Sequence, residues 1–357
     1  MNLYENETYK ADVRRVAKMD FPWGELAGKS VLISGVAGLL GSFLTDVLLY
    51  NNEERNLQII IYGLGRNEKS AEERFGQYFN CLRFLPCDVN TFSGEHINED
   101  VEVVFHLASN THPVAYATEP IDTIRINIVG HMHMLDFAVE HGAEKYLFAS
   151  SCEVYGENRG DTELFSEDYC GYIDSNTLRA GYPESKRCGE ALCQAYMKEK
   201  GLSVFIPRLS RTYGPTMLMS DSKALSQFIK KGLSGEDIVL KSDGMQYYSY
   251  TYMADAVAGM LTVLFRGTPG KAYNVADASS DIRLKDLAGI IAQKTGRKIV
   301  FELPEETEQL GYSKATKSRL DGTALRALGW RPQENIESGI SKTLDILKLC
   351  QKEAEKC

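Results

Sequence analysis

The sequence lacks the usual features of secreted, membrane and metal-binding proteins. No apolar run approaches the roughly 18 residues that a membrane-spanning helix requires, and Met1–Asp20 is mixed and charged, unlike a signal peptide. The eight cysteines form no Cys-x-x-Cys pair, and the spacing of His131 and His133 places them on different faces of a helix. We therefore expect a cytoplasmic protein with reduced thiols and without a metal site or a membrane anchor.

The chain also lacks a basic excess. It carries 40 Lys and Arg against 49 Asp and Glu, a formal net charge of -9, which argues against a nucleic-acid partner. Its 357 residues and 43% hydrophobic content are ordinary for one large globular domain with a second lobe. No internal repeat or low-complexity segment interrupts it.

Apolar runs that suit buried strands alternate with segments that suit helices. We expect strands at 29–34, 57–64, 83–87, 101–107, 145–150 and 203–209, and helices at 39–50, 121–141 and 182–200. This alternation predicts an α/β fold, a Rossmann-type doubly wound parallel sheet. The predicted divisions are an N-terminal extension (1–28), a dinucleotide-binding domain (29–210) and a smaller C-terminal substrate-binding lobe with returns to the main sheet (211–357).

A glycine-rich turn follows the first expected strand. Gly35, Gly38 and Gly41 have the spacing Gly-x-x-Gly-x-x-Gly, and Leu39 and Leu40 open the next helix. Glycines at such positions permit a tight turn and the close approach of a pyrophosphate to the helix N-terminus. The pattern predicts a site for NAD or NADP.

The second expected strand ends without the acidic residue that usually binds the adenosine ribose of NAD. Arg66 stands near that point and favours NADP if it meets a 2′-phosphate; alternatively it is a solvent-exposed arginine stacking on the adenine. Asp88 and Val89 follow the third strand, where Asp88 either contacts the adenine or caps a turn. His106 ends the fourth strand, as a core residue or as a cofactor contact.

Tyr182 and Lys186 are four residues apart, so a helix places them on one face. An ammonium near a phenol lowers the phenol's pKa, which would let Tyr182 act as a general base on a substrate hydroxyl. Ser151, at the end of a strand, either holds the same hydroxyl or satisfies backbone groups.

These motifs together give the chain a family resemblance. Over residues 29–345 it resembles the extended short-chain dehydrogenase/reductase family, specifically its nucleotide-sugar epimerases, dehydratases and decarboxylases. The landmarks that carry this resemblance are the glycine turn, His106-Leu107-Ala108-Ser109, Asn127, Ser151, Tyr155-Gly156, Tyr182 with Lys186, Tyr213-Gly214-Pro215 and Asp255. Within the family, Glu153-Val154-Tyr155-Gly156 and Arg179-Ala180-x-Tyr182 are most similar to UDP-glucuronate decarboxylases.

The resemblance implies a role for each residue of the site. It implies a nucleotide-sugar substrate, a transient 4-keto sugar and a homodimer formed through a four-helix bundle of 121–141 and 182–200. The implied catalytic residues are Ser151, Glu153, Tyr182 and Lys186. The implied cofactor contacts are Gly35, Gly38, Leu39, Leu40, Gly41, Arg66, Asp88, Val89, Leu107, Ala108, Ser109, Asn127, Tyr182 and Lys186. The implied substrate contacts are Tyr116, Cys152, Arg179, Arg211 and Tyr248.

The alternatives within this resemblance depend on a few positions. Glu153 favours a decarboxylase or a 4,6-dehydratase over a 4-epimerase, and Cys152 disfavours thymidine-linked dehydratases, which carry an aspartate there. Arg211 replaces an asparagine that often contacts the substrate, and Tyr248 replaces an arginine that grips its diphosphate. Arg66 and the missing arginine at Tyr248 leave open an NADP-dependent reductase or dehydrogenase, and a 4-epimerase is the other alternative, in either case on a different and possibly non-UDP substrate.

Overall fold

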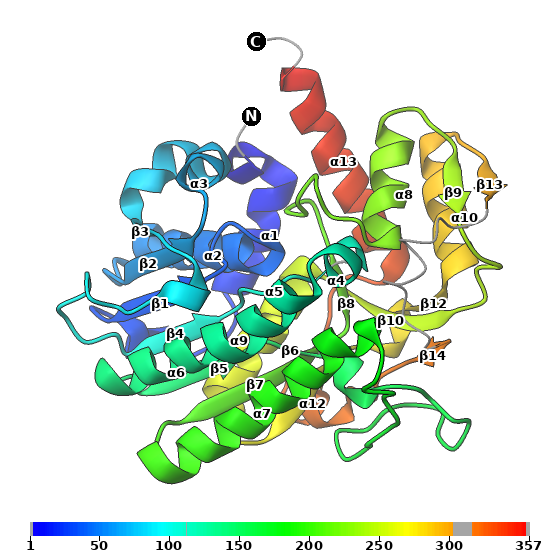
Figure 1. Ribbon diagram of the computed structural model, residues 1–357. Helices are drawn as coiled ribbons and strands as arrows, with labels where there is room; N and C mark the ends of the chain where they lie inside the picture. Colours follow the sequence, from blue (N-terminus) through cyan, green and yellow to red (C-terminus); the bar gives the residue numbers. More distant parts are fainter. Residues whose placement is uncertain (1–2, 112, 303–315, 355–357) are drawn as a thin grey trace.

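The computed structural model describes residues 3–111, 113–302 and 316–354. A parallel sheet with helices on both faces occupies one part of the molecule, and a smaller lobe lies beside it (Figure 1). The strands of the main sheet are β1 (Ser30–Ser34), β2 (Ile60–Gly65), β3 (Arg83–Pro86), β4 (Val103–His106), β5 (Lys145–Phe148), β6 (Ser150–Ser151), β7 (Val204–Leu209) and β11 (Ala272–Val275).

The strand order confirms the predicted doubly wound sheet. The order is β11-β7-β5-β4-β1-β2-β3, with β6 also pairing β7, and all of these pairs are parallel. The chain therefore winds outward from β1 in both directions, and the carboxyl ends of the strands meet at one edge.

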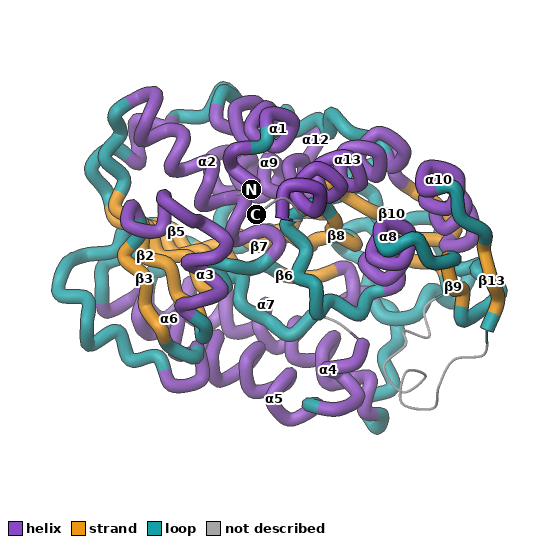
Figure 2. Tube along the Cα trace, turned by 90° about the horizontal axis from the view of Figure 1, so that it is seen from above, coloured by secondary structure: helices purple, strands orange, loops and turns teal. Residues whose placement is uncertain are grey.

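Two hydrophobic clusters cover the two faces of this sheet. In β1, Val31 and Ile33 belong to one cluster and Leu32 to the other, because successive strand residues point to opposite faces. Figure 2 shows the resulting layers, with helices above and below the strands. The first layer contains α1 (Glu7–Ala17), α2 (Leu39–Arg55) and α9 (Met253–Arg266), and the second contains α5 (Pro120–Arg125), α6 (His131–Glu140) and α7 (Gly181–Lys200). Two shorter helices, α3 (Glu68–Phe75) and α4 (Pro113–Thr118), precede α5.

The expected long helix over 121–141 is interrupted by one π-helical turn, Ile126–Gly130, between α5 and α6. Buried Asn127 lies in this turn, where its Nδ2 donates to the carbonyl of Thr123 and its Oδ1 accepts from the hydroxyl of Ser109. The wider turn thus coincides with a side chain that links the helix to the loop after β4.

The N-terminal segment packs as part of the core. Helix α1 lies against α2 and α9, and Phe21 stacks on Phe265 of α9 with ring centroids 5.3 Å apart. Arg15 Nη1 donates to Asp255 Oδ1 at 2.8 Å, and the hydroxyl of Tyr252 donates to Asp12 at 2.9 Å. This segment therefore holds the junction between β10 (Tyr247–Tyr252) and α9.

The second lobe is assembled from short strands and helices that follow β7. Its strands are β8 (Arg211–Tyr213), β9 (Ile238–Leu240), β10 (Tyr247–Tyr252), β12 (Asp281–Arg283), β13 (Ile299–Phe301) and β14 (Lys317–Ser318). Its helices are α8 (Ala224–Leu233), α10 (Leu284–Thr295), α12 (Thr323–Ala327) and α13 (Ile336–Ala354). Strand β10 pairs with β8, β12 and β14, whereas β11, late in the sequence, pairs with β7 in the main sheet.

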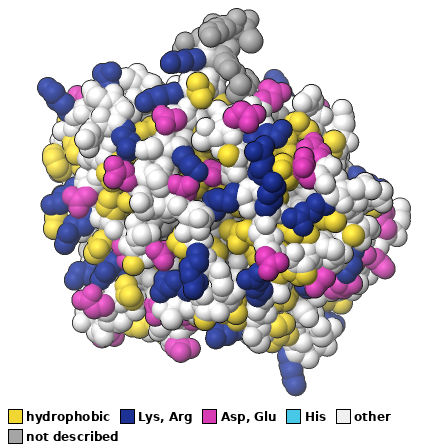
Figure 3. Space-filling view, turned by 180° about the vertical axis from the view of Figure 1, so that it is seen from behind, with side chains coloured by type: hydrophobic (Ala, Val, Ile, Leu, Met, Phe, Trp, Pro, Cys, Tyr) yellow, Lys and Arg dark blue, Asp and Glu magenta, His cyan; other side chains and the backbone are white. Residues whose placement is uncertain are grey.

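The surface is mixed in character. Figure 3 shows Lys and Arg side chains interspersed with Asp and Glu over one face. No helix within the described ranges combines the length and apolar character needed to cross a bilayer.

Candidate active site

A cleft of about 910 Å³ lies between the carboxyl ends of the main strands and the second lobe. It is lined by the turn between β1 and α2, the ends of β2 and β4, the segment after β6, α7, β8 and β10. Nearly every residue that the sequence analysis assigned to the site lines this cleft. These residues are Gly35, Gly38, Leu39, Leu40, Gly41, Arg66, Asp88, Val89, Leu107, Ala108, Ser109, Tyr116, Ser151, Cys152, Glu153, Arg179, Tyr182, Lys186, Arg211 and Tyr248.

The glycine turn places the N-terminus of α2 at one end of the cleft. Gly35 has φ +72°, and a Cβ there would approach Ala108 Cα to 3.0 Å. A Cβ on Gly41 would collide with the carbonyl oxygen of Gly35. No side chain caps α2 at Gly38, so the amides of its first turn are available to an anion. These features fit the pyrophosphate of a dinucleotide.

Arg66 and Asp88 lie together at the adenosine end. Their charged groups are 3.9 Å apart, and the Arg66 side chain is 63% exposed. Asp88 Oδ1 also accepts a hydrogen bond from the amide of Asn90, so this carboxylate caps a short turn, as one reading of the sequence proposed. Both groups line the cleft, where either could meet the adenosine part of a dinucleotide.

His106 and Asn127 stand behind the lining residues. His106 is buried and pairs with Ser34 Oγ at 2.9 Å, as a core histidine would. Burial lowers the pKa of His106 to about 3, with Lys186 contributing in the same direction, so its imidazole is neutral. Asn127 does not line the cleft itself, but its Oδ1 accepts a hydrogen bond from the hydroxyl of Ser109, which does.

Tyr182, Ser151 and Lys186 come together in the centre of the cleft. We expected Lys186 to lower the pKa of Tyr182, but burial raises that pKa, although a hydrogen bond with Ser151 opposes the rise. Lys186 is itself buried, which lowers its pKa to about 7. Its Nζ donates to the carbonyl of Ala149 at 2.9 Å and lies 5.9 Å from the centroid of the Tyr182 ring. Desolvation thus outweighs the expected charge effect.

Glu153 is held as a carboxylate by two arginines. Arg179 Nη2 donates to Glu153 Oε2 at 2.7 Å, and Arg211 Nη2 lies 3.8 Å from Oε1. Burial acts to raise the pKa of Glu153, but the two guanidinium groups outweigh it and leave the pKa below its usual value. Arg179 comes from the short turn before α7 and lies over the ring of Tyr116, which stacks on Tyr182.

The two positions that depart from the family pattern face each other. Arg211 on β8 pairs in register with Tyr250 of β10, and its Cζ lies 3.4 Å from the ring centroid of Tyr248. Arg211 Nη1 also approaches Cys152 Sγ at 3.9 Å. Burial raises the pKa of Cys152, so its side chain is a neutral thiol. A guanidinium from β8 therefore occupies the side of the cleft where Tyr248 replaces an arginine.

The far end of the cleft contains groups that the sequence analysis missed. Lys223, Gln227 and Lys231 line it from α8 and its N-cap, and Lys241 lines it from the segment after β9. These residues lie within about 20 positions of one another in the sequence. Their spacing in the sequence does not identify them as site residues, because the short helices and strands of this lobe are placed around the cleft only by tertiary packing.

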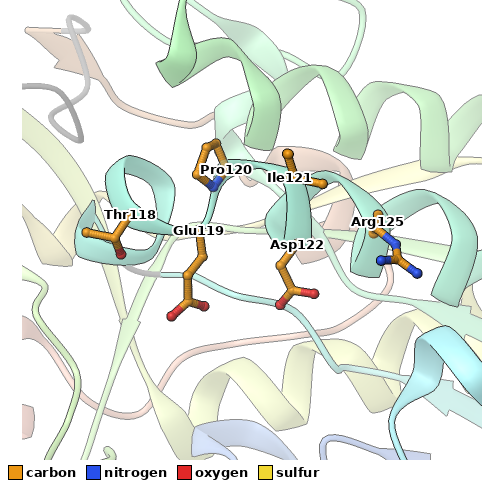
Figure 4. Close-up of a pocket in the computed structure, with 6 residues that line it drawn as sticks. All are labelled: Thr118, Glu119, Pro120, Ile121, Asp122 and Arg125. Carbon is orange, nitrogen blue, oxygen red and sulfur yellow. The ribbon is translucent and has the colours of Figure 1, made fainter.

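A second, shallower depression of about 300 Å³ lies on the surface at the junction of α4 and α5 (Figure 4). Glu119 and Asp122 point to the same side of the chain, whereas Pro120 and Ile121 lie on the other. Asp122 is already bound by the amides of Asn90 and Asn110 at 3.5 and 3.4 Å. The depression contains none of the assigned catalytic residues, so the large cleft is the candidate active site.

Comparison with known proteins agrees with this geometry. Residues 31–276 match the model of the NAD dependent epimerase/dehydratase family. The chain belongs to this family. It is 31% identical over 320 residues to UDP-glucuronic acid decarboxylase 1 of Xenopus tropicalis, covering 90% of this chain and 72% of that protein.

Solved structures show the same fold. A dTDP-glucose 4,6-dehydratase of Streptomyces venezuelae, solved with NAD bound, has a TM-score of 0.78 at 22% identity, covering 91% of this chain and 98% of its own. A UDP-glucuronic acid 4-epimerase of Bacillus cereus has a TM-score of 0.76 at 20% identity, covering 90% of this chain and 99% of its own.

Proposed function

We propose that this protein modifies a nucleotide sugar through a transient 4-keto intermediate with enzyme-bound NAD(P), as a UDP-glucuronate decarboxylase. The observation that carries this proposal is the ionised carboxylate of Glu153 in the same cleft as Ser151, Tyr182 and Lys186. The 31% identity to a UDP-glucuronic acid decarboxylase supports the decarboxylase over a 4,6-dehydratase or a 4-epimerase.

In this proposal Tyr182 moves the proton of the sugar's C4 hydroxyl, and Ser151 holds the same oxygen by a hydrogen bond. Burial keeps the Tyr182 phenol protonated at rest, so its proton leaves only when positive charge favours the phenolate. A dinucleotide held by the glycine turn would supply the hydride acceptor and, in its oxidised form, positive charge in the cleft that Tyr182 lines. Because the pKa of Lys186 is about 7, part of the protein carries a protonated Lys186 at neutral pH, and that ammonium also favours the phenolate.

The C4 ketone then activates the neighbouring carbon. Loss of CO2 from C5 leaves negative charge that spreads onto the ketone oxygen, where Ser151 and Tyr182 are placed to donate hydrogen bonds. Glu153 lies beside them as a second acid–base group. Because its pKa is lowered, it is ionised at neutral pH and must take up a proton before it can protonate C5 in place of the lost CO2. Return of the hydride to C4, with a proton from Tyr182 to the oxygen on C4, would then complete the cycle without net oxidation.

For the cofactor we propose NADP with Arg66 as the partner of the 2′-phosphate, since β2 ends at Gly65 and is followed by Arg66 and Asn67, without an acidic residue at its end. The exposed guanidinium can turn from Asp88 to a phosphate at small cost, because an exposed ion pair contributes little. NAD is the alternative, and it is favoured if Arg66 remains paired with Asp88.

We also propose a homodimer formed through the helices around α5, α6 and α7. Apolar side chains are exposed on the first of these, with Ile121 73% and Ile124 38% exposed. Val129 and Met132 continue this surface along the π turn and α6. For the compartment we propose the cytoplasm, since no disulfide joins the cysteines of the described residues.

Incubation with UDP-, GDP-, CDP- and dTDP-sugars, followed by mass spectrometry, tests the function. We expect loss of CO2 from UDP-glucuronate without stoichiometric consumption of an added dinucleotide. Tyr182→Phe is the control, because it should abolish turnover while cofactor binding persists. Loss of water would indicate a dehydratase, and an unchanged mass with inverted configuration at C4 would indicate an epimerase. Stoichiometric use of NADPH would indicate a reductase, the alternative that Arg66 favours.

A further inference from the structure

Two arginines share one carboxylate unequally in the cleft. Arg179 makes the short contact with Glu153, at 2.7 Å, whereas Arg211 stands 3.8 Å away. Arg179 therefore neutralises Glu153, and the charge of Arg211 is left in excess. The cleft thus carries local positive charge beside the residues assigned to proton transfer, which favours an anionic group on the substrate.

The guanidinium of Arg211 is oriented by an aromatic ring rather than by short hydrogen bonds. Its Cζ lies 3.4 Å from the ring centroid of Tyr248, whereas Glu153 Oε1 and Cys152 Sγ lie 3.8 and 3.9 Å from its terminal nitrogens, beyond the length of a short hydrogen bond. A guanidinium carries five N–H donors in a fixed plane. Stacking fixes that plane and leaves donors directed toward a ligand in the cleft, which Arg211 lines.

The position of Arg211 indicates which part of the substrate it meets. Ser151 and Tyr182 are assigned to the oxygen on C4, and the substituent on C5 is the neighbouring one on the sugar ring. Cys152 and Glu153 follow Ser151 directly in the chain, and Arg211 contacts both. Three other lysines that line the cleft, Lys223, Lys231 and Lys241, belong in contrast to the second lobe, where they lie on α8, at its N-cap and after β9. The diphosphate is more simply accommodated there.

We propose that Arg211, stacked on Tyr248, binds the C6 carboxylate of a hexuronate substrate and so selects uronates over neutral sugars. This inference rests on the proposed function and assigns the residue that sets its substrate class. Arginine and carboxylate form a planar, bidentate pair that lysine and amide side chains do not reproduce.

The same geometry predicts how Arg211 divides its effect between binding and rate. Its attraction acts on the carboxylate of the bound substrate, and it weakens as that carboxylate becomes neutral CO2. Such an interaction stabilises the ground state at least as much as the transition state. Loss of Arg211 should therefore raise KM strongly and change kcat little.

The test compares the affinities of UDP-glucuronate and UDP-glucose, measured by calorimetric titration of the cofactor-loaded protein. All variants carry Tyr182→Phe, so that UDP-glucuronate is bound but not converted during the titration. UDP-glucose has the same nucleotide and diphosphate but no carboxylate. The variants are Arg211→Gln, which keeps polar atoms without charge, and Arg211→Lys, which keeps charge without the planar fork. Arg14→Gln is the matched control, because Arg14 is an exposed residue of α1 and its replacement removes the same charge outside the cleft.

We expect Arg211→Gln to weaken binding of UDP-glucuronate by about 10- to 100-fold, the range for a hydrogen bond to a charged group. Binding of UDP-glucose should change by less than about threefold, and its retention shows that the variant is folded. Arg211→Lys should give an intermediate loss, and Arg14→Gln none.

Three outcomes overturn the inference. An equal loss of affinity for both ligands would assign Arg211 to the diphosphate, and unchanged affinities would remove it from the substrate site. A protein with Arg211 intact that does not prefer UDP-glucuronate would leave no selectivity to explain. The proposed function fails separately: a protein that prefers UDP-glucuronate through Arg211 but releases no CO2 refutes the decarboxylase alone.

Discussion

Replacing Arg179 by methionine tests whether its guanidinium keeps Glu153 ionised. Arg179 donates the 2.7 Å hydrogen bond to Glu153, and Arg211 remains 3.8 Å away as the second cation. Methionine is similar in length to the apolar stem of arginine, so contact with the ring of Tyr116 is largely retained. The substitution therefore removes mainly the ion pair.

The structure sets the magnitude of this loss. A hydrogen bond to a charged group contributes about 1.5–3 kcal/mol. The side chains of Arg179 and Glu153 are only 14% and 20% exposed, so water screens the pair weakly. Because Arg211 still compensates part of the charge, we expect Arg179→Met to lower the free energy of unfolding at pH 7 by about 2 kcal/mol.

The pH dependence provides a second measurement. Burial acts to raise the pKa of Glu153, and Arg179 and Arg211 hold it below its ordinary value of 4.5. In the wild type this contribution to stability is present above about pH 4.5 and is lost as the pH falls through the lower folded value. Without Arg179, Arg211 alone opposes burial, so the pKa of Glu153 rises and the acidic loss of activity moves to higher pH.

Urea unfolding at pH 7 and the pH profile of kcat/KM measure the two effects. Arg159→Met is the matched control, because Arg159 is exposed beside Tyr172 and lies outside the cleft. The reasoning is refuted if the acidic limb of Arg179→Met coincides with that of the wild type. It is also refuted if the stability loss is no larger than in Arg159→Met.

Three further substitutions test other parts of the site, and a fourth, Gly289→Ala on α10, lies outside the cleft and serves as a control. Gly41→Ala places a Cβ against the carbonyl of Gly35, so cofactor affinity in a fluorescence titration should fall at least about 10-fold. Gly289→Ala has open space around its Cβ and should instead raise the free energy of unfolding by about 0.5–1 kcal/mol. Arg66→Ala should weaken NADP more than NAD in the same titration, and equal losses would contradict the 2′-phosphate assignment. Burial lowers the pKa of Lys186 to about 7, so above pH 7 the unfolded chain binds more protons than the folded chain. The stability of the fold should therefore rise between pH 7 and 9. Lys186→Met should flatten this rise in thermal melts.

The cofactor end of the site was the part most accessible from sequence. The apolar run of β1, the glycine spacing and the start of α2 are local features, and each requires only neighbouring residues to define its geometry. Alternation of such units also predicts the parallel sheet, because β1, β2 and β4 are buried on both faces.

The electrostatics of the centre could not be predicted in the same way. Four-residue spacing correctly places Tyr182 and Lys186 on one helix face, but the pKa of each depends on how completely other elements bury it. Burial is a sum over contacts from distant segments, so a pattern within one helix does not contain it. The expected lowering of the Tyr182 pKa was wrong for this reason.

The features of the site likewise fall into two groups, those set by local sequence and those set by tertiary contacts. Local sequence alone determines the glycine turn, the Tyr182 and Lys186 pair and the doubly wound sheet, since helix and strand periodicities act over a few residues. Only the tertiary structure brings Arg211 of β8 onto Tyr248 of β10 and both toward Glu153. These residues lie on separate elements, and strand pairing between β8 and β10 decides which side chains meet. Substrate selection, as we propose it, therefore depends on packing that no local pattern contains.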